Sequence, residues 1–229
     1  MSAVKKSPRA KSSELRILSG KYKGTKLKSP DLATTHPMGS REKLALFNML
    51  SPYLEGATVL DYFAGSGALG LEALSRGAAS VTFIENNPKA LQTIRENCER
   101  CGAMGDKWQA ARCFPNNKEI FPRKITNARG PESETVAKRN FSEGPPERCD
   151  FEGRKISRSE NISRLPSFSI IISDPPYDNY QVPDYEKLLK KGGILALSHP
   201  KDFNLKAITG LTLLKTNHYA ACHISLFTK

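Results

Sequence analysis

The stretch "ATVLDYFAGSGALG", Ala57 to Gly70, decides the fold of this chain of 229 residues. Its first half has the apolar, β-branched and aromatic composition of a buried strand, and the glycines after it open a predicted helix. The spacing Gly65-x-Gly67-x-x-Gly70 is typical of a strand–loop–helix turn that approaches a nucleotide. Glu85 follows Gly65 by 20 residues, at the end of the next predicted strand. This spacing alone also fits a dinucleotide site.

Asp61 favours a different ligand, because a carboxylate sits badly beside a pyrophosphate. S-adenosylmethionine has no phosphate, and its ammonium and sulfonium suit a carboxylate. The glycines let the backbone approach such a ligand, and the start of the helix suits the ligand's own carboxylate. Glu85 can accept hydrogen bonds from the ribose hydroxyls, with Asn86 on the adenine side. The predicted cofactor residues are Asp61, Phe63, Gly65, Gly67, Glu85 and Asn86. A tight turn without a ligand is the alternative.

Alternating strands and helices surround this loop and predict an α/β fold with a mostly parallel, doubly wound sheet. We expect strands over residues 57–63, 80–85, about 106–112, 168–173 and 193–198, and an antiparallel pair within 212–227 joined near Asn217. We expect helices over 66–77, 87–102 and 184–193, and upstream over 40–54 with Ser40 as N-cap. Residues 15–30 alternate apolar and basic side chains, which predicts a small hairpin turning at Gly20 and Gly24.

A second motif, Asp174-Pro175-Pro176-Tyr177, follows the predicted strand 168–173. Two adjacent prolines cannot donate ladder hydrogen bonds and impose a rigid, extended exit from the strand. A carboxylate, a carbonyl and a ring are thereby fixed at the carboxyl end of a strand, where open α/β sheets bind ligands. A purely structural turn would explain the prolines but not the acid and the aromatic ring together. These four residues are the predicted catalytic set.

The segments "DYFAGSG" and "DPPY" together resemble the class I amino-methyltransferases. Upstream, "RILSGKYKGTKL" and "REKLALFNML" resemble the RsmD family, bacterial enzymes that methylate N2 of a guanine in small-subunit ribosomal RNA. The resemblance covers roughly residues 15–105 and 167–229. It implies a Rossmann-like class I methyltransferase fold with S-adenosylmethionine as methyl donor and no metal. Three features depart from the family: His36-Pro37-Met38 stands where Arg-Pro-Thr is usual, the acid that holds the adenine amine has no clear counterpart, and the family has no insertion as long as residues 114–165.

The chemistry expected of such an enzyme assigns a role to each residue of the second motif. The Asp174 carboxylate and the Pro175 carbonyl can accept the two amine hydrogens and direct the nitrogen lone pair at the methyl group. Pro176 locks the turn, and Tyr177 offers a ring face to a flipped-out or unpaired base. The same motif would also allow a DNA adenine-N6 methyltransferase. An inactive RNA-binding protein of the same fold is the third hypothesis.

The charge is unevenly distributed along the chain. The net charge is +12, and residues 1–56 hold 11 Lys and Arg against 4 Asp and Glu, or +7. A basic arm on a near-neutral body favours a nucleic acid partner, with a merely solubilising surface as the alternative. We expect this partner to be small-subunit ribosomal RNA or an assembling small subunit, bound by a monomer. The predicted RNA-binding residues are Arg16, Lys21, Lys23, Lys26, Lys28 and Arg41.

These patterns divide the chain into a basic, disordered tail (1–13), an RNA-contacting extension (14–56) and a methyltransferase domain (57–229). Residues 114–165 interrupt this domain without any sustained period. A disordered insertion is the preferred interpretation, against an RNA-contacting loop or a local frame error. No signal peptide or membrane span is evident, and the five cysteines are an odd number without framework spacing. We therefore expect a soluble, cytoplasmic protein with reduced thiols.

Overall fold

The computed structural model describes residues 15–30, 38–103, 105–112, 166–177, 182–220 and 222–229. The predicted tail 1–13 and the predicted insertion 114–165 lie outside the described residues, as do His36 and Pro37. No helix in the described ranges combines the length and the apolar composition that a membrane crossing requires. Cys98, Cys101 and Cys222 are buried free thiols, as expected, whereas Cys113 and Cys149 lie outside the described residues.

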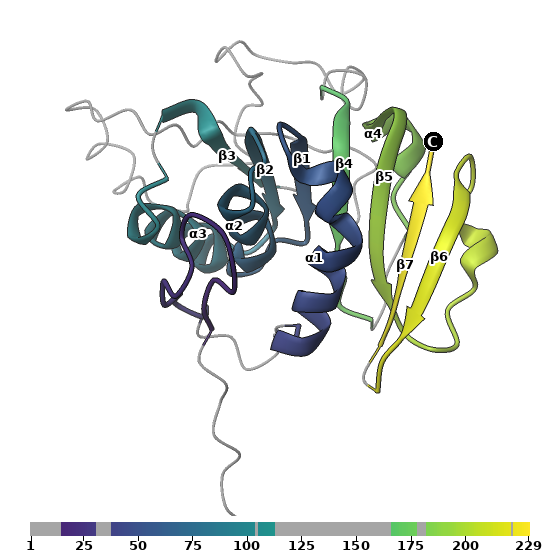
Figure 1. Cartoon of the computed structure of the whole chain (residues 1–229), viewed down its shortest axis with the longest axis horizontal. Helices are drawn as coiled ribbons and strands as arrows, with labels where there is room; N and C mark the ends of the chain where they lie inside the picture. Colours follow the sequence, from purple (N-terminus) through teal and green to yellow (C-terminus); the bar gives the residue numbers. More distant parts are fainter. Residues whose placement is uncertain (1–14, 31–37, 104, 113–165, 178–181, 221) are drawn as a thin grey trace, which may run out of the picture.

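The described strands form one seven-stranded sheet with helices on both faces (Figure 1). The strands are β1 (Thr58–Tyr62), β2 (Ser80–Glu85), β3 (Trp108–Arg112), β4 (Phe168–Ser173), β5 (Leu189–His199), β6 (Thr212–His218) and β7 (His223–Thr228). The helices are α1 (Ser40–Leu54), α2 (Ala68–Ser75), α3 (Pro88–Arg100) and α4 (Tyr185–Leu188). Short 3-10 turns lie at Gly105–Lys107 and Leu205–Ala207.

The strand order is β3-β2-β1-β4-β5-β7-β6. Strands β1 to β5 are parallel, and β7 runs antiparallel to both β5 and β6, which confirms the predicted sheet. The chain leaves β1 toward β2 on one side, while β4 pairs on the other side, so the order reverses between β1 and β4. In open α/β sheets, such a switch point is where the loops at the carboxyl ends of the strands leave room for a ligand.

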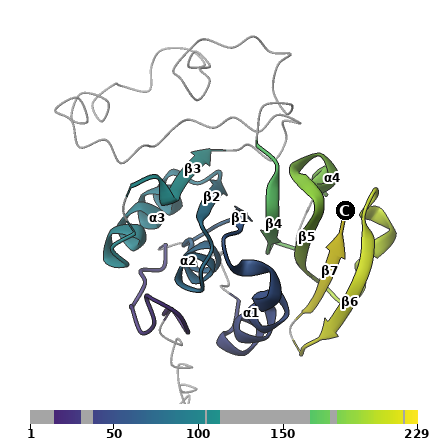
Figure 2. The ribbon, with the colours of Figure 1, turned by 45° about the horizontal axis from the view of Figure 1, so that its top comes forward.

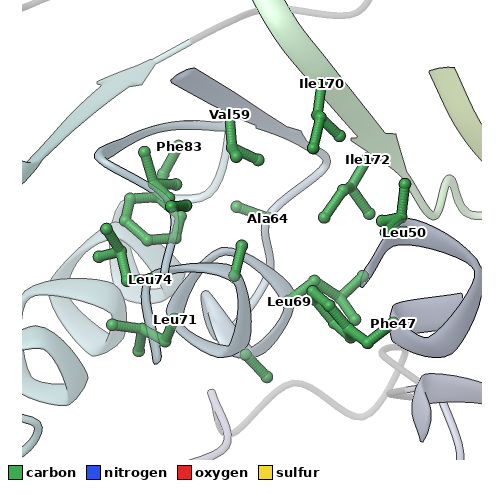
Figure 3. Close-up of a cluster of buried hydrophobic side chains, with 14 of the residues drawn as sticks. Phe47, Leu50, Val59, Ala64, Leu69, Leu71, Leu74, Phe83, Ile170 and Ile172 are labelled. Carbon is green, nitrogen blue, oxygen red and sulfur yellow. The ribbon is translucent and has the colours of Figure 1, made fainter. Parts of the chain in front are cut away.

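Apolar side chains fill both faces of the sheet. Helices α1, α2 and α3 cover one face, and α4 lies on the other (Figure 2). On the first face, Phe47 and Leu50 of α1 and Leu71 of α2 pack toward the strands that carry Val59 and Ile172 (Figure 3). Since a helix buries only one stripe, the apolar spacing of residues 40–54 had to face this sheet. The core therefore fixes α1 and α2 against the two strands, β4 and β1, that flank the switch point.

Residues 15–30 form the predicted hairpin. Arg16 and Lys26 make an antiparallel bridge, and the Ile17 N–H donates to the Thr25 carbonyl at 3.0 Å. Ile17 and Leu27 are buried against the body of the protein. The two buried side chains leave the basic residues of the hairpin on its outer side, as the alternation predicted.

Two predicted local features are wrong, and a third is confirmed. Residues 184–193 form only the single turn α4, because β5 begins at Leu189 and its pairing with β4 and β7 outweighs a short helix ending in two glycines. Gly39, not Ser40, is the N-cap of α1, and it makes no side-chain cap hydrogen bond. The predicted junction near Asn217 is confirmed: β6 ends at His218, and the turn to β7 is closed by the Tyr219 N–H donating to the Cys222 carbonyl at 2.9 Å.

Candidate active site

The loop after β1 is shaped by residues in left-handed backbone conformations. Phe63 has φ 68°, and it alone among the described non-glycine residues has a positive φ. Such strain is commonly kept where a loop must present its backbone to a ligand. Gly65 has φ 53°, and a Cβ added there would meet nothing within 4 Å. The outer side of the loop therefore faces open space, as the cofactor prediction requires.

Gly70 explains why the third glycine is needed. A Cβ at this position would overlap the Phe83 ring and lie 2.7 Å from a methyl carbon of Val81, both on β2. The glycine thus lets α2 pack directly against β2. Its backbone N–H is also within 2.8 Å of Asp61, which ties the first turn of the helix to β1.

Asp61 is the buried acid of the site, with 1% of its surface exposed. Its Oδ2 accepts from Gly70, but its Oδ1 has no hydrogen-bond partner within the described part of the chain. Burial raises the pKa of Asp61 to about 8, and the negative charges of Asp174 and Glu85 raise it further against the Gly70 hydrogen bond. A buried carboxylate oxygen without a partner is costly, and a cationic ligand group would relieve that cost.

Glu85 joins the end of β2 to the glycine loop. One carboxylate oxygen accepts from the Gly65 N–H at 2.8 Å, and the other accepts from the N–H groups of Asn86 and Asn87, each at 2.8 Å. Asn86 is exposed beside it. Asn87, which the sequence analysis did not single out, caps α3 by accepting from the Lys89 N–H at 2.9 Å. The Asn-Pro pair at a helix start is the signal that could have identified this cap.

The second motif leaves the end of β4, next to β1. Asp174 is half-buried, and burial raises its pKa to about 6, against a lowering hydrogen bond from Ser198. Pro175 is buried and Pro176 is exposed. Tyr177 is 40% exposed, while its hydroxyl lies 2.7 Å from the Ser198 hydroxyl. The motif thus combines an acceptor of elevated pKa with a half-open aromatic ring.

Strand pairing brings the two motifs to the same edge of the sheet. Tyr62, the last residue of β1, is level with Ile84 of β2 and with Ser173 of β4. Asp61, Glu85 and Asp174 therefore lie at the ends of three adjacent strands, and the charges of the last two act on the pKa of Asp61. The predicted cofactor and catalytic residues occupy one region, with the open face of Gly65 among them.

Two residues of this region were missed by the sequence analysis. Ser198 is the penultimate residue of the neighbouring strand β5 and is 2% exposed. The buried Cys222 thiol, just before β7, lies within hydrogen-bonding reach of both Ser198 and Tyr177. The position of Ser198 at the end of a predicted buried strand was available as a signal. Cys222 carried none, because its placement depends on the antiparallel return of β7.

The hairpin is attached to the helices that flank the glycine loop. Glu72 of α2 is fully buried and accepts from the N–H groups of Leu18 and Ser19 at 2.7 and 3.0 Å. On α3, the Asn97 amide bonds both the N–H and the carbonyl of Lys28, and it also donates to the Ser66 carbonyl at 2.9 Å. One buried side chain therefore bridges the basic hairpin and the cofactor loop.

The predicted RNA-binding side chains all lie on the surface. Lys28 has an ionic partner, since its ammonium is 2.5 Å from the Glu96 carboxylate. The exposed residues are Arg16, Lys21, Lys23, Lys26, Lys28 and Arg41. Their exposure fits contact with a polyanion, and RNA binding by them remains a prediction.

Comparison with known proteins places the chain among relatives. Residues 15–130 match the family described as conserved hypothetical protein 95. Over 94 residues, the chain is 45% identical to ribosomal RNA small subunit methyltransferase D of Escherichia coli K12, which covers 41% of this chain and 48% of that protein. Over 92 residues, it is 44% identical to the protein of the same name from Haemophilus influenzae, covering 40% and 47%. The chain thus spans about half the length of these curated relatives.

Solved structures extend the likeness to nearly the whole chain. One is the Escherichia coli protein yhhF, whose description names a methyltransferase; it has a TM-score of 0.65 at 22% identity and covers 94% of this chain and 98% of its own. Another is a hypothetical protein of Thermus thermophilus, with a TM-score of 0.63 at 26% identity, covering 93% and 99%. These neighbours and the sheet order show the Rossmann-like class I methyltransferase fold.

Proposed function

Because this chain belongs to the RsmD-like methyltransferase family described as conserved hypothetical protein 95, we propose that it methylates the exocyclic N2 amine of a guanine in small-subunit ribosomal RNA. S-adenosylmethionine is the proposed methyl donor. One observation carries the proposal: Asp174, an acceptor for amine hydrogens, stands beside a glycine loop whose buried Asp61 oxygen is unpaired in the described structure. The names of the relatives support ribosomal RNA as the substrate class.

The residues present fit S-adenosylmethionine. The unpaired oxygen of Asp61 suits the cationic amino acid part, and the open space at Gly65 admits a ligand against the backbone. Glu85 is half-buried at the end of β2, where its oxygens can exchange backbone donors for ribose hydroxyls. Phe63, Gly67 and Asn86 complete the proposed pocket. When bound, the cofactor supplies an electrophilic methyl group.

The protein's own task is to orient a weak nucleophile. The lone pair of the guanine amine is delocalised into the ring, so the amine hydrogens must be drawn out of the ring plane. The Asp174 carboxylate and the Pro175 carbonyl accept these hydrogens, while the half-exposed Tyr177 ring stacks on the base. Positioning of this kind can supply much of the rate acceleration. Pro176 keeps the acceptors and the ring in one fixed arrangement.

The proposed function is tested by incubating the purified chain with labelled S-adenosylmethionine and separate substrates. The substrates are small-subunit ribosomal RNA, the partly assembled small subunit, and duplex DNA. We expect label in RNA or in the particle, and nucleoside mass spectrometry should identify N2-methylguanosine. Label in DNA adenine would establish the DNA enzyme instead, and cofactor-independent RNA binding without label would establish the inactive binding protein.

The first prediction concerns the cofactor pocket. Glu85→Ala should weaken binding of S-adenosylhomocysteine by about 1–3 kcal/mol, the scale of hydrogen bonds to a charged acceptor. Calorimetric titration measures the loss, and melting curves check the fold, because Glu85 also holds the Gly65 N–H. Glu99→Ala is the matched control, since Glu99 is an exposed glutamate near the end of α3. Equal affinities of wild type and folded Glu85→Ala would remove Glu85 from the pocket.

The second prediction concerns the hairpin. Replacing Lys21, Lys23 and Lys26 with glutamine should weaken RNA binding and flatten its dependence on salt, by up to about one slope unit for each phosphate that is no longer neutralised. Cofactor affinity should barely change, because these side chains are exposed on the outer side of the hairpin. A control variant with the same charge loss at the exposed lysines Lys201, Lys206 and Lys215 should keep more of the affinity. An unchanged affinity and salt slope in the hairpin variant would leave these lysines a solubilising role only.

A further inference from the structure

Ser198 connects the two functional groups of the second motif. It is the penultimate residue of β5, and its neighbour Leu197 is level with Ser173, the residue before Asp174. Its hydroxyl lies 2.7 Å from the Tyr177 hydroxyl. It also lies close enough to the Asp174 carboxylate for a hydrogen bond that lowers the pKa of Asp174. Only 2% of Ser198 is exposed. One buried hydroxyl thus contacts both the carboxylate and the aromatic side chain that the reaction requires.

We propose that Ser198 is the positioning residue of this site, holding the Asp174 carboxylate and the Tyr177 ring in one fixed relation for methyl transfer. The catalytic role in this inference rests on the proposed function, whereas the contacts of Ser198 are independent of that function. Neither the motif nor the relatives' names point to this residue.

The hydrogen-bonding capacity of the three groups fixes the direction of the chain of hydrogen bonds. A serine hydroxyl has one proton to donate, whereas an ionised carboxylate can only accept. The arrangement that satisfies all three groups has the Tyr177 hydroxyl donating to Ser198 and Ser198 donating to Asp174. The Cys222 thiol beside them is a weak donor and cannot replace the serine at equal strength.

Each end of this chain of hydrogen bonds has a consequence for the reaction. The donation to Asp174 stabilises the ionised carboxylate, so it opposes the rise in pKa that burial causes. The contact with Ser198 anchors the hydroxyl of Tyr177, a residue that is 40% exposed. Ser198 itself lies on a strand paired on both sides, by β4 and β7, and is therefore a rigid support. Small displacements of reacting groups can cost about a hundredfold in rate, so this support matters.

The test compares Ser198→Ala, Tyr177→Phe and the double variant in steady-state and single-turnover methyl transfer to RNA. We expect Ser198→Ala to lower kcat by about ten- to a hundredfold, the scale of a hydrogen bond to a charged group, with little change in KM or cofactor affinity. The kcat of this variant should fall at low pH, as in the wild type, but this acid limb of the pH–rate profile should lie at higher pH, because Asp174 loses a stabilising donor. Tyr177→Phe should lower kcat with a smaller shift of the limb. The double variant should lose less than the sum of the single losses.

Controls separate positioning from folding. Ser225→Ala removes another buried serine of the same sheet, one that bonds His199 and Thr216, and should leave the rate and the acid limb unchanged. Ser198→Thr keeps the hydroxyl and should restore most of the rate if it folds. Additive losses in the double variant, or an unmoved acid limb in a folded Ser198→Ala, would overturn the proposal.

A substrate-free measurement keeps the inference apart from the proposed function. Carbon NMR titration of the Asp174 carboxyl should give a higher pKa in Ser198→Ala than in wild type. If wild type transfers no methyl group to RNA but this difference is present, the proposed function fails and the contact stands. If wild type is active and the pKa does not differ, the role of Ser198 fails alone.

Discussion

Asp174→Ala is expected to lower the rate of methyl transfer by about a hundred- to a thousandfold, the scale of losing one well-placed polar group at a reacting centre. Cofactor affinity should stay near the wild-type value, because Asp174 follows β4 and lies outside the proposed cofactor residues. Those residues are at the end of β2, with Glu85, and in the glycine loop after β1. The loss should fall on kcat rather than KM, since alignment of the amine is what disappears. Steady-state assays over a range of RNA concentrations measure kcat and KM, and calorimetry measures the cofactor affinity.

The elevated pKa of Asp174 adds a pH dependence to this prediction. Burial raises the pKa to about 6, and only the ionised carboxylate can accept both amine hydrogen bonds. The wild-type kcat should therefore fall as pH drops through about 6. The side chain of the Asp174→Asn variant cannot ionise, so the residual rate of this variant should not fall as pH drops through about 6. Because the folded pKa lies above the ordinary value of 3.8, ionisation of Asp174 costs stability as pH rises toward 6. The Asn variant should thus be at least as stable as wild type at neutral pH. A rate close to wild type in either variant, with RNA saturating, contradicts the assigned role.

The central part of this fold could be predicted because local and global signals agree there. Strands 80–85 and 168–173 have the predicted bounds, since they are apolar runs delimited by a glycine, an asparagine or a proline. The paired positions of Asp61, Glu85 and Asp174 followed from one rule, that parallel strands end at a common edge. Segment 184–193 failed for the opposite reason. Its residues favour a helix locally, but pairing of Leu189 with Phe168 recruits them into β5.

The remaining parts of the site depend on contacts that no local pattern contains. Ser198 reaches Tyr177 across 21 positions of sequence, and Glu72 reaches Leu18 across 54. The hairpin was predicted as part of an extension separate from the methyltransferase domain, but it is bonded to both helices next to the glycine loop. In the sequence, Asn97 is indistinguishable from any other polar residue of a helix. Only the fold shows that its amide donates to the carbonyls of both Lys28 and Ser66.

Glu72→Ala is expected to lower the free energy of unfolding by about 3–5 kcal/mol, the range for breaking a buried ion pair from one side. Glu72 is fully buried and pairs with the ammonium of Lys43 at 3.5 Å and the guanidinium of Arg76 at 2.8 Å. It also accepts two hairpin N–H groups, from Leu18 and Ser19. The truncation leaves two cations and two donors without their acceptor. Urea unfolding measures the loss, and hydrogen exchange at Leu18 and Ser19 should accelerate more than at β4.

The exposed ion pair between Lys28 and Glu96 supplies the matched control. It joins the same hairpin to α3, but both partners remain in contact with solvent. Glu96→Ala should change stability little, because exposed pairs contribute little after screening and entropy are counted. Equal effects of Glu72→Ala and Glu96→Ala would mean that the buried cluster is not what holds the hairpin.

The pH dependence of the Glu72→Ala variant follows from Lys43, which is 3% exposed. Burial lowers the pKa of Lys43, and the charge of Glu72 opposes that lowering in the wild type. Without Glu72, the pKa of Lys43 in the folded state should fall further below its ordinary value of 10.5. The pH range in which the folded state binds fewer protons than the unfolded state therefore becomes wider. Stability of the variant should therefore rise toward wild type as pH increases through that window, since neutral Lys43 is cheaper to bury than the cation. Adding Lys43→Met to Glu72→Ala should remove this pH dependence and recover part of the loss. If the free energy of unfolding of Glu72→Ala lies below that of wild type by the same amount at every pH, the loss comes from the missing hydrogen bonds to the hairpin and not from the unpaired cation.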